Sequence, residues 1–415
     1  MKTIHRLLIM LLSVTPIATH AQRNEILNDR IATLQVVAGD DWLSPPVTFL
    51  QGKPIHISFD DLTHEYHRYT YKIQHCEADW SVSDGLFESD YIDGFTDGNL
   101  IEDTEESLNT NMLYTHYRLT IPNKNCRLKM SGNYRLTVYD DNNDEEPMFS
   151  ACFMVVEPRM SVSMTISPNT DIDVNKSHQQ VSMALNYNGV HVTDPTSQLH
   201  RVVMQNGRWD NAILNARPQY TMNDGLRWEH CRALIFDAGN EYHKFEVLDT
   251  DHPTLGIDRI RWDGERFHAF VFTNEPRPNY LYDEDANGAF YIRNSDNIEN
   301  DRLTDYVMVH FQLMCPSPVE GDVYLNGVWT NDQFLPEYQM EYDEVSKSYQ
   351  AAILLKMGYY SYQYLLVDND GYTHVMPTEG NFFQTENKYQ ALVYYREPGG
   401  RADLLVGYQQ VQTKY

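Results

Sequence analysis

Apolar and polar residues alternate with a period of two along nearly the whole chain, whereas helical periodicity is almost absent. Alternation of this kind is typical of strands that bury one face. Clusters of Gly, Asn, Asp and Pro separate the alternating runs, as in sandwiches built from short strands joined by turns. The pattern therefore predicts an all-β protein.

The first domain is predicted over residues 22–158, and Pro158 ends it. The stretch 81–111 is long and polar, and it is expected to be an inserted loop. An acidic turn at 140–146 is expected to join the last two strands as a hairpin. The strands expected in this domain cover residues 54–59, 69–75, 114–120, 134–140 and 149–157.

A second sandwich is predicted over 159–302 and a third over 303–415. In the third, Tyr306–Leu313 alternates strictly, and Tyr349–Tyr372 is expected to form two strands that meet at Gly358. This order resembles the starch- and glycogen-binding sandwiches of amylolytic enzymes. Because no low-complexity linker is present, the three immunoglobulin-like sandwiches are expected to pack in series as a semi-rigid rod.

Residues 1–21 are predicted to be a secretory signal peptide, in which basic residues precede the apolar run Leu7–Val14. Small residues lead to a cleavage site after Ala21. The next residue is Gln22 rather than Cys, so no lipoprotein anchor is expected. No later run approaches the roughly 20 apolar residues that a membrane helix needs. The mature chain is therefore expected to be exported and soluble.

The formal net charge is −27. Binding to nucleic acid needs clustered Lys and Arg, so this charge argues against a nucleic-acid partner, and it argues equally against direct anchoring on anionic lipids. Solubility through self-repulsion is the favoured interpretation, and a partner with a basic face is the alternative.

Five cysteines are widely spaced, and no CxxC motif occurs. Zinc-finger and redox motifs are therefore excluded. Free, buried thiols are expected. The alternative is one disulfide among Cys76, Cys126 and Cys152, because exported proteins permit such bonds.

The sequence carries no recognisable catalytic motif. There is no GxSxG elbow and no glycine-rich phosphate loop, and the 16 histidines are scattered. The 59 acidic residues would form some carboxylate pairs by abundance alone, so such pairs are uninformative. Neither an enzymatic activity nor a cofactor is predicted.

One stretch resembles the first half of a calcium loop. Asp283, Asp285 and Asn287, followed by Gly288, have the DxDxNG spacing. The twelfth position would be Asn294, where a bidentate Glu is expected, and no flanking helices are predicted. An Asn-Gly turn with solvating aspartates is therefore favoured, and no bound metal is expected.

An aromatic group near the end of the chain has two interpretations. Trp329, Tyr359, Tyr360, Tyr362 and Tyr364 could form a platform on which a sugar stacks. Alternation places Tyr360, Tyr362 and Tyr364 on one strand face, and an aromatic core face is the favoured interpretation. The platform would suit an exported carbohydrate-binding protein, which is the alternative function.

Several motifs occur in order along the chain: HCEADW at 75–80, YIDGF at 91–95, YTHYRLTIPN at 114–123, SGNYRLTVYD at 131–140, MQNGRWDNAI at 204–213, FDAGNEYHKFE at 236–246, YDEDANGAFYI at 282–292, LLKMGYYSYQY at 354–364 and ENKYQALVYYREPGGRADLLVGY at 386–408. Together they resemble the plug proteins of the type IX secretion system of Bacteroidota. Met357 stands where a Gln is more typical of the family.

The resemblance implies a periplasmic, non-enzymatic subunit that is monomeric before docking. It would bind the periplasmic side of the giant outer-membrane β-barrel translocon and close the pore when no substrate is present. The motif residues are expected to be signatures of the fold first and contacts to the translocon second. These candidate contacts are His75, Trp80, Tyr91, Tyr114, His116 and Tyr117.

Overall fold

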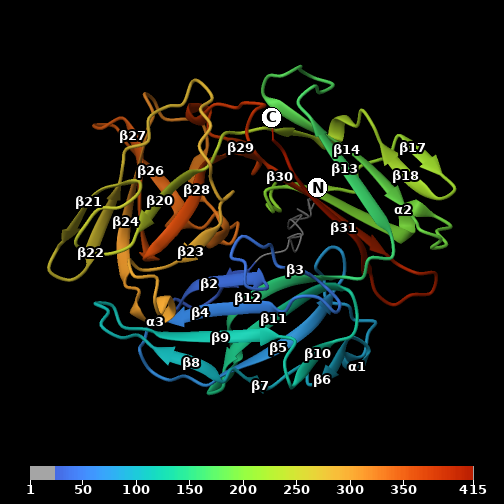
Figure 1. Ribbon diagram of the computed structural model, residues 1–415, viewed down its shortest axis with the longest axis horizontal. Coiled ribbons are helices and arrows are strands. Elements are labelled where there is room, and N and C mark those ends of the chain that lie inside the picture. The colour runs from blue at the N-terminus through green and yellow to red at the C-terminus, as the bar shows by residue number, and fades with distance from the viewer. Residues whose placement is uncertain (1–23, 415) are drawn as a thin grey trace, which may run out of the picture.

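The computed structural model describes residues 24–414, so the predicted signal peptide lies outside the described residues. Within that range the protein is all-β, as predicted, and its strands form three lobes (Figure 1). The helices are single turns: α1 (Glu88–Tyr91), α2 (Pro195–Gln198), α3 (Asn300–Leu303), and the 3-10 turns η1 (Arg232–Leu234), η2 (Val328–Thr330), η3 (Pro336–Tyr338) and η4 (Pro377–Glu379).

The first sandwich packs a six-stranded sheet, ordered β1-β12-β11-β5-β7 with β3 beside β12, against the sheet β2-β4-β9-β8. The hairpin of 140–146 is present, because β11 and β12 pair antiparallel across it. The strands are β1 (Glu25–Ile26), β2 (Ile31–Ala38), β3 (Val47–Phe49), β4 (Ile55–Asp61), β5 (Tyr69–Cys76), β7 (Asn99–Leu100), β8 (Asp103–Glu106), β9 (Thr115–Ile121), β11 (Gly132–Asp140) and β12 (Asn143–Val156).

Alternation explains how these strands pack. In β5, Tyr69, Tyr71 and Ile73 are fully or almost fully buried, and the residues between them are partly exposed. Aromatic rings fill the space between the sheets, and the rings of Phe59 and Tyr117 stack at 5.1 Å. Burial of such large apolar surfaces is the main term that holds the sandwich together.

The stretch 81–111 is not the unstructured insertion that its polarity predicts. It contains α1, β7 and β8, together with β6 (Ile92–Gly94), which pairs with β10 (Cys126–Leu128). These strands are too short to produce a clear alternating pattern, so the sequence signal for them is weak. The insertion therefore extends the first sandwich instead of projecting from it.

The second sandwich is completed by the end of the chain. One sheet has the order β13-β14-β18-β17, with β19 beside β14, and the facing sheet has the order β16-β15-β30-β31. Their strands are β13 (Ser161–Ser167), β14 (His178–Asn186), β15 (Leu199–Gln205), β16 (Ile213–Leu214), β17 (Tyr220–Met222), β18 (Gly225–Trp228), β19 (Ile235–Asp237), β30 (Lys388–Tyr395) and β31 (Leu404–Gln412).

The third sandwich is inserted between β19 and β30. Its ten strands form one connected sheet, in which β26 pairs with β25 through its first residues and with β27 through its last, so that it turns the corner between the two faces. The strands are β20 (His243–Val247), β21 (Ile257–Trp262), β22 (Phe267–Val271), β23 (Phe290–Ile292), β24 (Tyr306–Met314), β25 (Asp322–Asn326), β26 (Gln339–Asp343), β27 (Ser348–Lys356), β28 (Gly358–Val367) and β29 (Thr373–Val375).

The predicted boundary between 302 and 303 therefore does not divide the chain as expected. The strands β20 to β23 precede it but pair within the third sandwich, and β30 and β31 follow it but pair within the second. One apolar core likewise joins Met160, Trp228 and Tyr389. Alternation reports that a segment is a strand and which face is buried, but it carries no information about the neighbouring strand.

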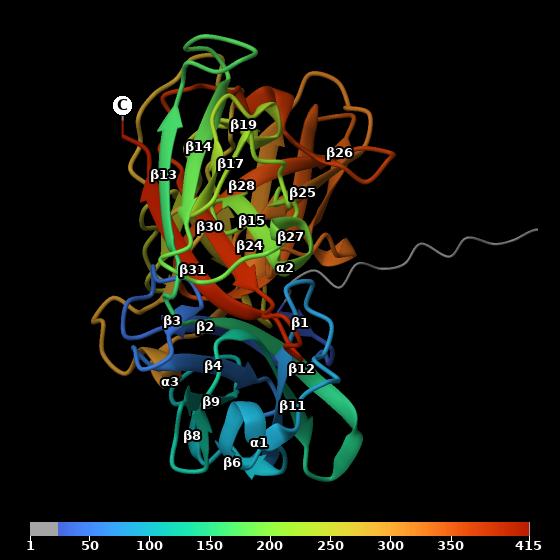
Figure 2. The same cartoon turned by 90° about the vertical axis from the view of Figure 1, so that its right-hand side faces the viewer.

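The three sandwiches do not form a rod. The second and third lie side by side on the first, which forms the base of the molecule (Figures 1 and 2). Each sandwich contacts both others, and a mixed core between the first and second contains Trp80, Met154, Leu392 and Tyr394. Polar motifs of the first sandwich contact the second and third sandwiches, and these contacts hold the three sandwiches in a compact arrangement.

Candidate functional site

The six candidate contact residues are all buried. The most exposed of them is Tyr91 at 7 %, and His75, Trp80, Tyr114 and Tyr117 lie at or below 1 %. A side chain without exposed surface cannot reach a partner unless the fold opens. His116, at 5 %, is equally enclosed. In the folded chain these side chains offer almost no surface to a partner, and their positions agree with a role as fold signatures.

His75 fixes the start of the HCEADW motif. Its Nδ1 lies 2.8 Å from Ser83 Oγ, and its Nε2 donates to the Ser131 carbonyl oxygen at 3.1 Å. The backbone of Gly132 presses on the ring, with φ +143° and room for no Cβ atom. Burial lowers the pKa of His75, so the imidazole is held neutral as a hydrogen-bonding strut.

Trp80 and its neighbours join the first sandwich to the second. The Trp80 ring meets Trp209 edge-on at 5.9 Å. Beside it, Arg396 donates to Glu77 Oε2 at 2.6 Å and to Asp403 Oδ1 at 2.8 Å. The motif therefore forms a junction between lobes.

Asp60 and Lys356 join the first sandwich to the third. Lys356 Nζ donates to Asp60 Oδ2 at 2.7 Å, and the two side chains are 1 % and 0 % exposed. His116 Nδ1 and Tyr306 OH each donate to the same carboxylate at 2.6 Å. The Lys356 ammonium also lies 4.0 Å from the centre of the Tyr114 ring. We call these five residues the junction cluster.

The charges of the junction cluster compensate one another. Burial by itself would raise the pKa of Asp60, but Lys356 and His116 hold it below its ordinary value. Burial lowers the pKa of Lys356, and Asp60 opposes that shift. A buried ion pair of this kind is costly to break from one side, because the remaining charge has no partner and little water.

A rim of further contacts surrounds the junction cluster. Arg118 donates to Asp301 at 2.9 Å, and Tyr114 OH donates to the Thr304 carbonyl oxygen at 2.7 Å. The Asp305 carboxylate accepts the backbone N–H groups of Asn111 and Met112 at 2.7 and 3.0 Å. The stretch 301–305 is therefore held to the first sandwich along its length.

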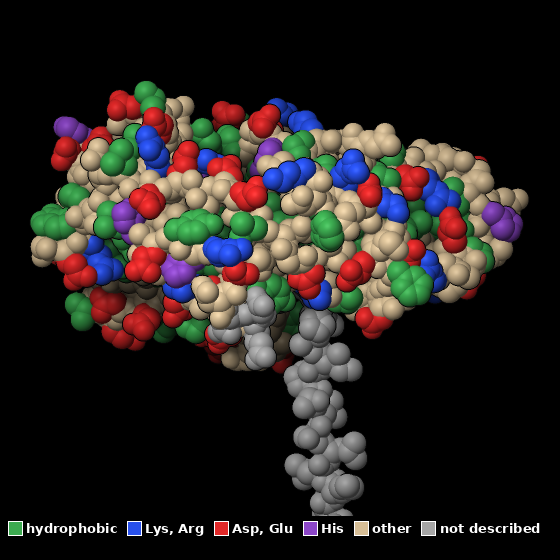
Figure 3. Space-filling view, turned by 90° about the horizontal axis from the view of Figure 1, so that it is seen from below, with side chains coloured by type: hydrophobic (Ala, Val, Ile, Leu, Met, Phe, Trp, Pro, Cys, Tyr) green, Lys and Arg blue, Asp and Glu red, His purple; other side chains and the backbone are tan. Residues whose placement is uncertain are grey.

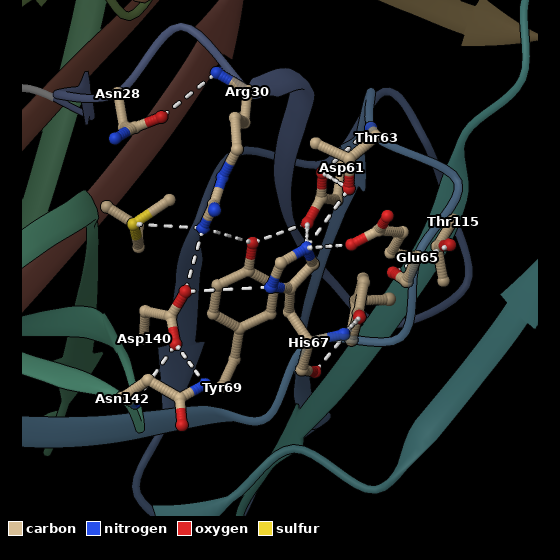
Figure 4. Close-up of polar contacts among 12 residues, drawn as sticks. Asn28, Arg30, Asp61, Thr63, Glu65, His67, Tyr69, Thr115, Asp140 and Asn142 are labelled. Carbon is tan, nitrogen blue, oxygen red and sulfur yellow. Dashed lines mark hydrogen bonds and ion pairs between the residues drawn. The ribbon is translucent and has the colours of Figure 1, made fainter.

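A second polar cluster closes one end of the first sandwich (Figure 4). Tyr69 OH donates to Asp61 Oδ2 at 2.6 Å, and Arg30 donates to Asp140 Oδ2 at 2.9 Å. The His67 ring lies between the two carboxylates, with nitrogen–oxygen distances of 3.8 and 3.6 Å. These contacts tie the ends of β4, β5 and β11 together.

The predicted calcium stretch forms a turn. Asn287 and Gly288 both have positive φ, and Ala289 N donates to the Ala286 carbonyl oxygen at 3.1 Å, as in the favoured Asn-Gly interpretation. The two aspartates do not simply solvate it, because Asp283 accepts from Lys244 at 2.6 Å, while Asp285 is half-buried and accepts two backbone N–H groups. Burial raises the pKa of the Asp285 carboxyl to about 7. Within residues 24–414, no group of three His, Cys, Asp or Glu side chains is arranged to hold a metal ion.

The proposed sugar platform lies inside the third sandwich. Trp329 is 7 % exposed and donates from Nε1 to the Ser361 carbonyl oxygen at 3.1 Å. Tyr360, Tyr362 and Tyr364 share one buried face of β28, as alternation predicts. Tyr359 points the other way, and its ring meets Trp42 at 5.8 Å. These residues form an aromatic core and leave no face for a sugar.

The cysteine expectation is confirmed, since all five cysteines are buried thiols outside any disulfide among the described residues. In the part of the chain that the structure describes, no helix is long and apolar enough to span a membrane. On the face seen from the first sandwich, acidic, basic and apolar side chains are interspersed without a block of one kind (Figure 3).

A comparison with known protein families identifies the family of the chain that carries these junctions. The family model "Type 9 secretion system plug protein 1st domain" matches residues 31–157, which span nearly all of the first sandwich. The chain belongs to the type IX secretion system plug protein family. This membership assigns the protein to type IX secretion, as a structural component that associates with the secretion machinery.

The whole plug-family chain is similar to a solved structure. The crystal structure of a hypothetical protein from Parabacteroides merdae is 38 % identical, with a TM-score of 0.91, and the match covers 94 % of this chain and 99 % of that one. Comparison with curated proteins gave no match.

Sequence reasoning missed the centre of the junction cluster in this plug-family protein. A weak signal was available, because Lys356 interrupts the apolar run LLKMGYY, and Asp60 follows the apolar end of IHISF. A charge within an apolar run is seldom left unpaired when buried. The identity of the partner depends on the packing of two sandwiches, which no local pattern encodes.

Proposed function

We propose that this protein is the periplasmic plug of the type IX translocon. It binds the periplasmic side of the giant outer-membrane β-barrel and closes the pore when no substrate is present. The observation that carries the proposal is the match of residues 31–157 to the first domain of plug proteins. Export by the predicted signal peptide and a monomeric state before docking belong to the same proposal.

The construction of the body supports this role. A plug must remain a single obstacle while a wide pore opens beside it, so its lobes must not separate. The junction cluster and the Glu77–Arg396 contact bond the first sandwich to both others. Because these polar groups are buried, separation of the lobes would cost free energy: each polar group would lose its hydrogen-bond or ion-pair partner.

The proposal is tested by deleting the gene and measuring two properties of the cells. The expected result is continued secretion together with increased entry of vancomycin-sized molecules, because the pore remains but its closure is lost. Re-expression of the wild-type chain should restore the barrier. Unchanged permeability in the deletion strain would overturn the proposal.

The partner is tested separately by affinity purification from solubilised outer membranes. The translocon barrel should co-purify with a tagged chain that is expressed at its natural level. A matched strain that carries the tag on an unrelated exported β-sandwich protein serves as the control. If the tagged chain is instead retained on insoluble polysaccharide and no barrel co-purifies, the alternative carbohydrate-binding function replaces the plug.

A further inference from the structure

A long groove crosses the outer face of the third sandwich. One hollow, of about 980 Å³, lies on the sheet of β21, β22, β24 and β27, which faces away from the second sandwich (Figure 1). A second hollow, of about 530 Å³, lies between the third sandwich and the strands β1 and β2 of the first. Glu337 and Ala352 line both hollows, so the two are continuous. We call them together the outer groove.

Strand register explains the floor of the outer groove. Phe270 of β22 lies opposite His310 of β24, which in turn lies opposite Ala352 of β27. The Phe270 and His310 rings stack face to face at 4.3 Å. The next side chain in this row is a methyl group, so the floor drops at Ala352. On the far side, the paired part of β26 ends opposite Gln350, and η3 forms the wall from there.

Three exposed apolar side chains lie along the outer groove. Phe272 is 56 % exposed in the first hollow, and Leu27 and Leu335 are 50 % and 36 % exposed in the second. A single exposed apolar side chain is ordinary on a protein surface. Three of them along one groove with an apolar floor are typical of a surface that a partner covers.

The charges of the outer groove that lack a counter-charge are negative. Asp29, Glu337 and Glu341 are exposed, and among the described residues none of them forms an ion pair with a Lys, Arg or His side chain. Glu337 meets the hydroxyl of Tyr338, which is neutral and leaves the charge uncompensated. Two of the three carboxylates belong to the third sandwich and one to the first, so negative charge extends along both hollows.

The other charged groups of the outer groove are already satisfied within the chain. Arg259 is paired with Asp258 at 2.5 Å. Asp343 accepts hydrogen bonds from the backbone N–H and the hydroxyl of Ser346. Burial lowers the pKa of His310, so its ring is neutral at pH 7. The groove therefore offers a partner an apolar floor and uncompensated negative charge.

We propose that the outer groove binds a segment of another protein that carries apolar side chains between Lys or Arg residues. The apolar side chains pack on the floor and against Phe272, Leu27 and Leu335. The long basic side chains lie along the walls, where their heads reach the three carboxylates and stay partly in water. Opposite charges favour such a segment over an acidic one and speed its association. The proposal does not depend on the plug role, because it rests on the groove alone.

The test is calorimetric titration of the purified chain, from residue 22 onward, with three synthetic peptides of equal length. The first alternates Leu with Lys, the second has Glu in place of each Lys, and the third has Ser in place of each Leu. The first should bind, and the other two should bind at least tenfold more weakly. Added salt should weaken binding of the first, because exposed charges are screened. The proposal is overturned if the first peptide does not bind at millimolar concentration, or if either of the others binds as tightly.

Variants of the chain locate the binding. Glu337→Gln/Glu341→Gln should weaken binding of the Leu–Lys peptide at least fivefold. Ala352→Arg should abolish it, because the new side chain raises the floor and repels Lys. Glu320→Gln/Asp370→Asn is the matched control and should bind like the wild type, since it removes two exposed charges of the third sandwich that lie outside the groove. Circular dichroism and melting curves verify that each variant is folded.

Three results with these variants would overturn the proposal. Equal losses in the control and in Glu337→Gln/Glu341→Gln would assign binding to the overall charge of the chain. Binding by Ala352→Arg as tight as that of the wild type would place the peptide elsewhere. A concentration-dependent dimer that Ala352→Arg disrupts, measured by analytical ultracentrifugation, would assign the groove to a second copy of this chain.

Discussion

Lys356 of β27 donates to Asp60 of β4 at 2.7 Å, across the boundary between the third and first sandwiches and out of contact with solvent. The two residues come from distant parts of the chain, so their pairing is a property of the assembled lobes. Because no nearby water can replace either partner, the pair makes the relative position of the two sandwiches part of the folded state.

Asp60→Asn should destabilise the protein by about 3–5 kcal/mol, since it leaves the Lys356 ammonium buried without a counter-charge. Denaturant unfolding followed by tryptophan fluorescence measures the loss. Glu344→Gln is the control, because the Glu344–Lys347 pair is exposed at the surface and should contribute nothing measurable.

The double variant Asp60→Asn/Lys356→Met distinguishes a specific pair from a general packing defect. It should be more stable than Asp60→Asn alone, because the uncompensated charge is removed together with its partner. Additive losses from the two substitutions would contradict this account of the junction.

His75 should make stability depend on pH. Burial lowers its pKa in the folded state, whereas the unfolded chain binds a proton near pH 6.5. The unfolded state therefore binds more protons below that pH, so this contribution to stability is complete above about pH 6.5 and is lost as the pH falls.

His75→Gln should reduce the difference in unfolding free energy between pH 7.5 and pH 5, even though the variant is less stable at both. His252→Gln serves as the control, because the His252 side chain is 81 % exposed. An unchanged pH dependence in His75→Gln would show that another group is responsible.

Gly132→Ala should be strongly destabilising. A Cβ at this position would lie 2.2 Å from His75 Nε2, and the backbone has φ +143°. Overpacking of this kind costs about 1–3 kcal/mol in addition to the conformational strain. Gly98→Ala isolates the strain, since Gly98 has φ +71° and nothing within 4 Å of the added atom. Equal losses in the two melting curves would refute the close contact with His75.

Trp329→Ala should cost about 3–5 kcal/mol, as truncation of a buried Trp does. It should not change how the folded chain behaves on insoluble polysaccharide, because the side chain belongs to the core. Trp262→Ala, at an exposed position, should have a small effect on the melting temperature. Retention of the wild type on insoluble polysaccharide, lost in a fully folded Trp329→Ala variant, would restore the platform interpretation.

The five cysteines should not react with iodoacetamide in the native protein. All are buried, and burial raises the pKa of Cys76 and Cys126 to about 12. Thiolates are the reactive form, so both effects suppress alkylation. Mass spectrometry should detect five added groups only after unfolding in denaturant without a reducing agent. Fewer than five would indicate a disulfide.

Local patterns predicted most of the strands but not their partners. The expected strand at 69–75 is β5 at Tyr69–Cys76, because alternation directly reports burial of one face. The pairing of β30 with β15 depends on residues that lie far apart in the sequence, and alternation is the same for every possible neighbour. The predicted series of three domains failed for this reason.

The candidate contact residues also show that sequence patterns do not identify the partner of a residue. Tyr114 and His116 are candidate contacts because they belong to a motif that resembles the plug family, and polar aromatic residues are common in protein contacts. They do form contacts, but with the chain's own third sandwich: Tyr114 OH donates to the Thr304 carbonyl oxygen, and His116 Nε2 lies 3.5 Å from Asp301 Oδ2. A sequence motif cannot distinguish an interface within one chain from an interface with another protein.

The position of β30 and β31 determines the order in which the molecule can be completed. A chain that emerges from its N-terminus delivers all strands of the third sandwich by residue 375, but the second sandwich still lacks two of its strands until residue 412 is available. Until then, the sheet of β13, β14, β17, β18 and β19 is faced only by β15 and β16, so part of its apolar face is open to chaperones, proteases and aggregation. A chain that ends between β29 and β30 therefore has all strands of the first and third sandwiches but an unfinished second one, which gives quality control a clear signal of truncation.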